Sequence, residues 1–188
     1  TEIYTLSLHD ALPIYIYIFR GTPILVQIFI IYYGLPQLEF IRESFFWPIL
    51  REPFGCAIIA LTLNTGAYVS EIFRGGVLGV DRGLKEAGAA LGLSVTHRFI
   101  YITSPIAIRL CLPAYSNDVI SLMKSTALAS TITLLDMMGI ARTIVAETYA
   151  PYEIFLSVMV IYLIITWVIQ RLFGWIERRM SRHVRSEA

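Results

Sequence analysis

Long apolar stretches, separated by shorter segments rich in charge, run through most of this chain. The clearest of them extends from Ile154 to Gln170 without one charged residue. A membrane-spanning helix needs about 20 mainly apolar residues, within a range of about 17–25. The pattern therefore predicts an all-α, polytopic membrane protein with about four transmembrane helices present. The predicted spans cover residues 22–38, 54–73, 113–135 and 154–170.

Composition supports a membrane protein. Hydrophobic residues make up 56% of the chain and charged residues only 15%, whereas an ordinary soluble domain carries about 25% charged residues. The net charge of +1 gives no reason to expect nucleic acid as a partner. The two cysteines, Cys56 and Cys111, stand beside apolar residues and form no C-x-x-C pair. We expect both to be buried, unpaired thiols.

The placement of basic residues predicts the orientation of the spans. If the spans alternate and the tail after Gln170 is cytoplasmic, the loop 74–112 also lies inside. Basic residues then concentrate inside, as the positive-inside rule requires. The inside segments hold Arg74, Arg82, Lys85, Arg98, Arg109, Arg171, Arg178, Arg179, Arg182 and Arg185. The outside loops 39–53 and 136–153 hold Arg42, Arg51 and Arg142.

The inside loop has the local signals of two short helices joined by a tight turn. Asp81 is placed to cap the first helix, and Gly92 to end it in a left-handed conformation. Ser94 is placed to cap the second helix, and Pro105 to end that one. A DNA-binding helix-turn-helix has a similar pattern. However, the segment lies between two spans, and its second helix offers only His97 and Arg98 to a groove.

The same loop carries a motif. Residues 86–88 read Glu-Ala-Gly, Gly92 follows four positions after Gly88, and residues 102–105 read Ile-Thr-Ser-Pro. This resembles the cytoplasmic signature of the permease subunits of ABC importers, which reads E-A-A, then Gly, then Ile-x-Leu-Pro. Gly88 and Ser104 depart from that pattern. The resemblance implies a coupling loop that docks on an ATPase subunit. Its expected coupling residues are Glu86, Ala87, Gly88, Gly92, Ile102 and Pro105.

The resemblance extends over nearly all of the chain. The segments FRGTPILVQIFIIYYGLPQL, LNTGAYVSEIFRGGV and SNDVISLMKSTALAS are similar to the polar amino-acid branch, above all to permeases for histidine, arginine, lysine, ornithine and opines. This implies the helical fold of a type I importer permease, with about five spans in an inner membrane. It also implies a cytoplasmic C-terminus, a second permease subunit that is identical or homologous, two ATPase subunits and a periplasmic solute-binding protein.

No enzyme activity is expected of this chain itself. It lacks the G-x-x-x-x-G-K-[ST] loop that holds nucleotide phosphates, so ATP and magnesium are expected in the partner ATPase and no cofactor in this chain. Neither a catalytic set nor a metal-ligand spacing is present. Two alternatives remain open at this point: a secondary transporter or channel that works without ATP, and an inert membrane scaffold.

Polar residues inside the spans form two stripes at helical spacing. The first stripe is formed by Asn64, Tyr68 and Glu71, at i, i+4 and i+7. The second stripe, Asn117, Ser121 and Lys124, has the same spacing, and Asp118 lies beside it. Such residues usually face a pathway or a protein interior, so they are candidates for an amino-acid pathway. Polar contacts that only hold helices together would give the same pattern. The candidates are Asn64, Tyr68, Glu71, Asn117, Asp118, Ser121 and Lys124.

In that pathway, Lys124 or a hydroxyl group would meet the carboxylate of the solute. Glu71 or Asp118 would meet its amino or guanidinium group.

The first fourteen residues, TEIYTLSLHDALPI, fit neither this pattern nor a signal peptide, because they contain no Lys or Arg. One back-translation of them is the sequence of a short-read library adapter. We therefore expect residues 1–14 to be non-native and the permease domain to cover 15–188. We also expect the first spanning helix of the family to be missing upstream of this junction.

Overall fold

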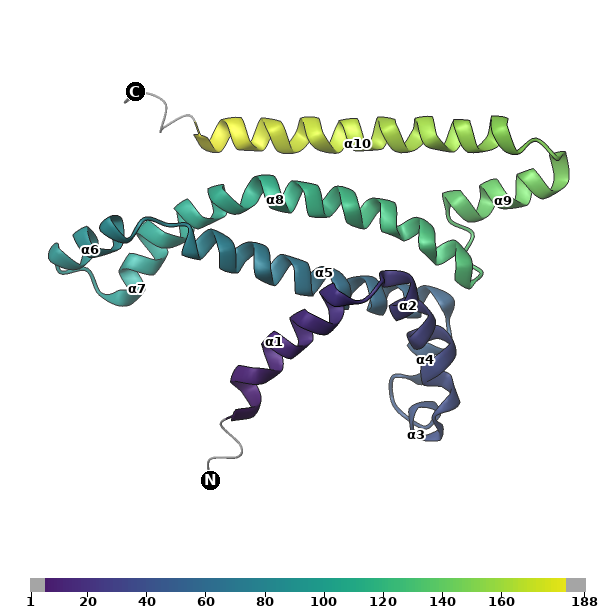
Figure 1. Cartoon of the computed structure of the whole chain (residues 1–188), viewed down its shortest axis with the longest axis horizontal. Coiled ribbons are helices and arrows are strands. Elements are labelled where there is room, and N and C mark those ends of the chain that lie inside the picture. The colour runs from purple at the N-terminus through teal and green to yellow at the C-terminus, as the bar shows by residue number, and fades with distance from the viewer. Residues whose placement is uncertain (1–5, 182–188) are drawn as a thin grey trace. The chain divides into compact units, whose positions relative to one another are not determined.

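The computed structural model describes residues 6–181, and the side chains of residues 11–180. All regular structure in this part of the chain is helical, without a strand (Figure 1). The longer helices are α1 (Leu6–Gly21), α2 (Ile24–Phe29), α5 (Pro53–Leu78), α6 (Arg82–Ala90), α8 (Ser104–Ser125), α9 (Met137–Thr148) and α10 (Pro151–Ser181). The short ones are α3 (Glu39–Arg42), α4 (Trp47–Leu50), α7 (Val95–Arg98), the π-helices η1 (Ile30–Gly34) and η3 (Phe99–Thr103), and the 3₁₀ helices η2 (Leu35–Gln37) and η4 (Thr126–Ile132).

Three helices of the described residues are long and apolar enough to cross a membrane. They are Pro53–Leu78, Val95–Ile132 and Pro151–Met180. A fourth span is present if the bent pair Ala11–Gly21 and Ile24–Gln37 counts as one. The predicted all-α membrane fold with about four spans is thus confirmed. Of the adapter-like residues 1–14, residues 1–5 lie outside the described residues and residues 6–14 form the first part of α1. The foreign origin of residues 1–14 stays a prediction.

The second of these helices, Val95–Ile132, is longer than its predicted span, 113–135, because it starts within the loop. The prediction that Pro105 ends a helix is wrong: Pro105 lies in the first turn of α8. The π-helix η3 ends directly before α8, and both belong to the continuous helix Val95–Ile132. Such a local π-helical turn lets a membrane helix continue through a proline, which has no N–H to donate. Pro113 lies inside α8 and does not end it either.

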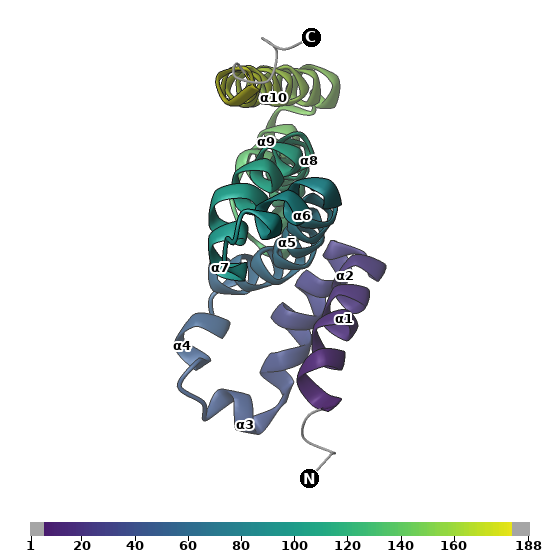
Figure 2. The same ribbon diagram turned by 90° about the vertical axis from the view of Figure 1, so that its left-hand side faces the viewer.

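The structure divides into two compact units. The first comprises the residues up to Tyr68 together with Ile120–Ile165, and the second comprises Val69–Val119 together with the residues from Thr166 onward. The core of the first unit is formed by residues of α2, η1, α4, the start of α5 and η4, elements that Figure 2 shows from the side. Its buried side chains are Ile28, Ile31, Leu50, Cys56, Ala57, Ala60, Ala129 and Ile132.

In the second unit, α5 and α8 approach each other closely at Gly76. A Cβ atom at that position would lie 2.1 Å from Cys111 Sγ and 2.9 Å from the Ala107 carbonyl oxygen. The Cys111 thiol in turn donates to the carbonyl oxygen of Ile72, 3.2 Å away. Both cysteines, Cys56 and Cys111, are buried and free. The prediction of two buried thiols is confirmed.

Candidate functional site: the coupling loop and a polar network at a helix break

The loop between α5 and α8 is built by local capping interactions. The Asp81 carboxylate accepts a hydrogen bond from the Gly83 N–H (2.6 Å) and caps α6. Gly92 follows α6 with a φ of +76°, a conformation that costs a residue with a Cβ about 1–2 kcal/mol. Ser94 caps α7 by accepting from the His97 N–H (3.3 Å). All three predictions are confirmed.

The turn after α6 has the two hydrogen bonds of a Schellman motif. The Leu93 N–H donates to the carbonyl oxygen of Gly88 (3.1 Å), and the Gly92 N–H donates to that of Ala89 (2.9 Å). These bonds satisfy carbonyl groups that the end of α6 would otherwise leave without a partner. The turn therefore fixes the direction in which α7 leaves α6, and Figures 1 and 2 both show the two helices side by side.

Gly88, where the family pattern has Ala, is explained by its packing. It is the one buried residue of α6. A Cβ atom at this position would lie 2.6 Å from Ile102 Cδ1 and 3.3 Å from Arg98 Cγ. Two of the six predicted coupling residues, Gly88 and Ile102, are therefore in direct contact. A methyl group here would require the end of the Ile102 side chain to move aside.

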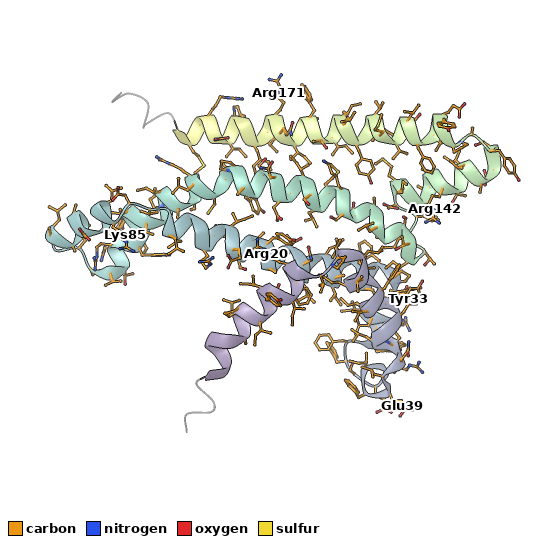
Figure 3. The ribbon with its side chains drawn as sticks, viewed as in Figure 1. Arg20, Tyr33, Glu39, Lys85, Arg142 and Arg171 are labelled. Atoms are coloured by element: carbon orange, nitrogen blue, oxygen red, sulfur yellow. The ribbon has the colours of Figure 1, made fainter. Side chains whose placement is uncertain are left out.

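Two long basic side chains connect the loop to its neighbours by hydrogen bonds. The Lys85 ammonium, labelled in Figure 3, donates to the carbonyl oxygen of Val77 (3.2 Å), the penultimate residue of α5. The Arg98 guanidinium donates to the carbonyl oxygen of Lys85 (3.4 Å). Each bond joins α6 to a neighbouring element of the same unit. The loop is therefore held both at the end of the second span and at the start of the third.

The outer surface of the loop is apolar. Leu91 is 81% exposed and Val95 is 73% exposed, and Leu84 and Tyr101 are exposed as well. Among the other predicted coupling residues, Glu86 and Ala87 are exposed and Pro105 is half-buried. Leu84 and Leu91 lie outside the helices that could cross a membrane, and exposed large apolar side chains in such a place favour contact with another protein. α7 has only four residues before η3 and α8 continue it, so it is no separate recognition helix for DNA.

Sequence reasoning missed the break between α1 and α2. The helix axes bend by 105° there. The amide nitrogen of Gln27, a buried residue, donates to the carbonyl oxygens of Phe19 (3.0 Å) and Thr22 (3.1 Å) and to Thr22 Oγ1 (2.9 Å). The Asn64 amide of α5 donates to the same Phe19 oxygen (2.9 Å) and to Gln27 Oε1 (3.1 Å). These bonds satisfy backbone groups that the break leaves free, as a membrane interior requires.

Two signals in the sequence could have shown this break. Gly21-Thr22-Pro23 is a helix-breaking run, and Gln27 is a lone polar residue in an apolar stretch. Next to the break, the Arg20 guanidinium, labelled in Figure 3, lies 5.1 Å from the ring centre of Tyr68. Polar groups of α1, α2 and α5 thus meet at one place in the first unit.

The predicted pathway residues fall in both units. In the first, Asn64 and Tyr68 lie at the break, and the side chains of Ser121 and Lys124 are exposed on α8. In the second, the Glu71 carboxylate accepts two hydrogen bonds from the Arg74 guanidinium (2.8 and 2.7 Å). Asn117 is exposed, and Oδ2 of Asp118 is buried without a hydrogen-bond partner in the described part of the chain.

A comparison with protein families matches residues 7–182 to the binding-protein-dependent transport system inner membrane component. This match covers nearly the whole chain, and the chain belongs to that family. It is a membrane-spanning transport permease and not an enzyme, as predicted. Membership implies ATPase and binding-protein partners and a multi-pass position in the inner membrane.

Individual relatives agree with this assignment. The chain is 50% identical over 174 residues to the octopine transport system permease protein of Rhizobium radiobacter, covering 89% of this chain and 71% of the relative. It is 44% identical over 173 residues to the histidine/lysine/arginine/ornithine transport system permease protein of Escherichia coli, covering 92% and 73%. A solved structure described as an amino acid ABC transporter with histidines is 34% identical in sequence to this chain, with a TM-score of 0.80. The match covers 95% of this chain and 78% of that one. The expected ABC importer permease fold is thereby confirmed.

Proposed function

We propose that this chain is the permease subunit of an ATP-driven importer for polar, basic amino acids or opines. The relatives named for octopine and for histidine, lysine, arginine and ornithine support this solute class. The structural observation that carries the proposal is the loop around α6 and α7. Hydrogen bonds connect this loop to two spans. The loop presents apolar side chains that the described residues leave uncovered.

In this proposal the loop is the contact with the ATPase subunit. Closure of an ATPase pair upon binding ATP and magnesium moves the segment from Glu86 to Gly92, and Ile102 and Pro105 pass the motion to α8. The spans then alternate between inward- and outward-open states, and a periplasmic binding protein delivers the solute. The loop and the C-terminus are cytoplasmic, in line with their basic residues. A second permease subunit, identical or homologous, completes the pathway.

The polar residues of the spans are proposed to line that pathway. Asp118 supports this role, because a buried carboxylate oxygen without a hydrogen-bond partner is costly unless something outside this chain pairs with it. The ammonium or guanidinium group of a basic solute is such a partner. Lys124 and Ser121, both exposed on α8, suit the solute carboxylate. Tyr68, Glu71 and Asn117 are proposed to complete the pathway, and Asn64 to act by holding the break beside it.

Replacement of Gly92 tests the coupling proposal. Gly92→Leu forces a β-carbon into a left-handed conformation and turns α7 away from α6. We expect ATP-driven uptake of labelled arginine into vesicles to fall at least tenfold, while membrane insertion stays normal. Gly75→Leu is the matched control, because a β-carbon at Gly75 meets nothing within 4 Å and no positive φ is involved. Normal uptake by the Gly92 variant would refute the coupling role.

The solute class and the energy source are tested separately with the unaltered chain. Competition by a panel of amino acids should be strongest with basic amino acids or opines. Depletion of ATP should abolish uptake. Uptake that survives ATP depletion would favour a secondary transporter or channel instead.

A further inference from the structure

One face of the last part of α10 carries arginine and tryptophan side chains in pairs. The guanidinium of Arg171 lies 5.1 Å from the ring centre of Trp167, and that of Arg179 lies 5.4 Å from the ring centre of Trp175. Each pair spans four residues, about one helical turn, so the side chains stack along one side. Arg178 belongs to the same side, where it lies over Gly174. We call Trp167, Arg171, Trp175, Arg178 and Arg179 the arginine–tryptophan face.

This face is positively charged and open. Both tryptophans are more than half exposed, and all three arginines are exposed. Within the described residues none of the three arginines forms an ion pair. Glu177 is the one acidic residue between 166 and 181. It lies between the paired positions along the chain, yet neither Arg178 nor Arg179 bonds to it. Figure 3 shows the labelled Arg171 extending outward from the α10 ribbon.

The length of α10 places this face at the edge of the bilayer. Its 31 residues make a helix of about 46 Å at about 1.5 Å per residue, whereas the hydrocarbon core is about 30 Å thick. The charge-free run Ile154–Gln170 fills that core, so Arg171 is the first charge beyond it. Trp167 lies within the last turn of the run. Tryptophan prefers this depth, because its ring packs on acyl chains while its N–H reaches polar groups.

We propose that the arginine–tryptophan face binds the headgroup of an anionic phospholipid. A guanidinium over an indole ring can still present its N–H edge, which can donate two parallel hydrogen bonds to a phosphodiester. Arg171 and Arg179 lie eight residues apart and offer two such edges at successive depths. The lipid chains extend along the apolar run of α10. The site is independent of the solute pathway and does not require the proposed function.

Lipid retained by the full purified chain tests the proposal. The chain is equilibrated with mixed micelles that contain equal amounts of phosphatidylglycerol and phosphatidylcholine, and bound lipid is counted by native mass spectrometry. We expect selective retention of phosphatidylglycerol. In the variant Arg171→Gln/Arg179→Gln that retention should fall about tenfold or more, because each arginine near an anionic surface contributes about fivefold in affinity. The control, Arg42→Gln/Arg142→Gln, removes two exposed arginines elsewhere and should retain the lipid.

Two further measurements keep the outcome decisive. Thermal unfolding of the double variant should occur at no lower a temperature than that of the control. Arg171 and Arg179 are exposed and form no hydrogen bond within the described residues, whereas Arg42 donates to the Pro36 carbonyl oxygen. Inorganic phosphate at millimolar concentration should not displace the lipid, because the acyl chains contribute to binding. Equal retention of both lipids by the unaltered chain would overturn the proposal. Unchanged selectivity in the Arg171/Arg179 variant, or displacement by inorganic phosphate, would overturn it as well.

Discussion

Helices are interrupted at two places in this molecule: in the loop around α6 and α7, and at the break between α1 and α2. The backbone groups at these two places are hydrogen-bonded in different ways. Both must satisfy backbone groups where a helix is interrupted. In the loop the neighbouring residues do this: Asp81 and Ser94 cap the helix starts, and the turn at Gly92 closes the end of α6. At the break, distant side chains do it, because Asn64 reaches from α5 to the carbonyl oxygen of Phe19.

This difference follows from where each interruption lies. Water can satisfy exposed groups in the loop, so local hydrogen bonds are sufficient there. Inside a bilayer no water replaces a missing partner, so the break depends on a polar residue from another helix. A polar side chain such as Gln27 or Asn64 in an apolar stretch therefore has a structural role even where it lies close to a solute pathway.

The largest effect is expected from Gly88→Ala in the loop. The new methyl group would lie 2.6 Å from Ile102 Cδ1, so the end of the Ile102 side chain must move aside. Overpacking of this kind costs about 1–3 kcal/mol, and we expect a matching decrease in the free energy of unfolding together with lower uptake. Gly75→Ala is the control, since its methyl group meets nothing within 4 Å. Equal stability of the two variants would contradict the close packing of α6 and η3.

Asn64→Leu should weaken the break. The substitution removes the hydrogen bonds to Phe19 and Gln27. Hydrogen bonds between helices in a membrane contribute about 1–2 kcal/mol in model peptides and about 0.6 kcal/mol on average in proteins. Thermal unfolding in detergent should therefore occur at a lower temperature. Asn117→Leu makes the same change at an exposed position of α8 and should leave the melting temperature unchanged. A similar decrease in both variants would show that Asn64 does not hold the break.

The smallest effects are expected from the helix caps, and they distinguish the loop from a capped helix outside it. Asp81 caps α6 in the loop, and Asp136 caps α9 in the other unit by accepting from the Gly139 N–H (2.9 Å). Replacing either with alanine should cost about 1 kcal/mol of stability. Only Asp81→Ala should also lower the uptake per ATP hydrolysed, because only α6 is proposed to contact the ATPase. Equal losses of uptake would argue against a special role for the loop.

The sequence predicted the parts of the fold that neighbouring residues determine. Asp81, Gly92 and Ser94 lie where local capping rules place them, and the apolar runs give the long helices. Pro105 was misread, because the π-helix η3 before it lets one helix continue through the proline. The close packing at Gly88 and the contacts of Asn64 depend on residues from other elements. Residue spacing along the chain carries no information about those.

Photo-crosslinking from the loop tests the central claim most directly. A benzophenone maleimide is attached to Leu91→Cys, on the loop, or to Leu135→Cys, which is similarly exposed beside α9; these positions are 81% and 71% exposed. The native cysteines are buried and react poorly. Irradiation of the assembled transporter should join Leu91→Cys to the ATPase subunit and should leave Leu135→Cys without that product. The same product from both positions, or from Leu135→Cys alone, would contradict a coupling role for this loop.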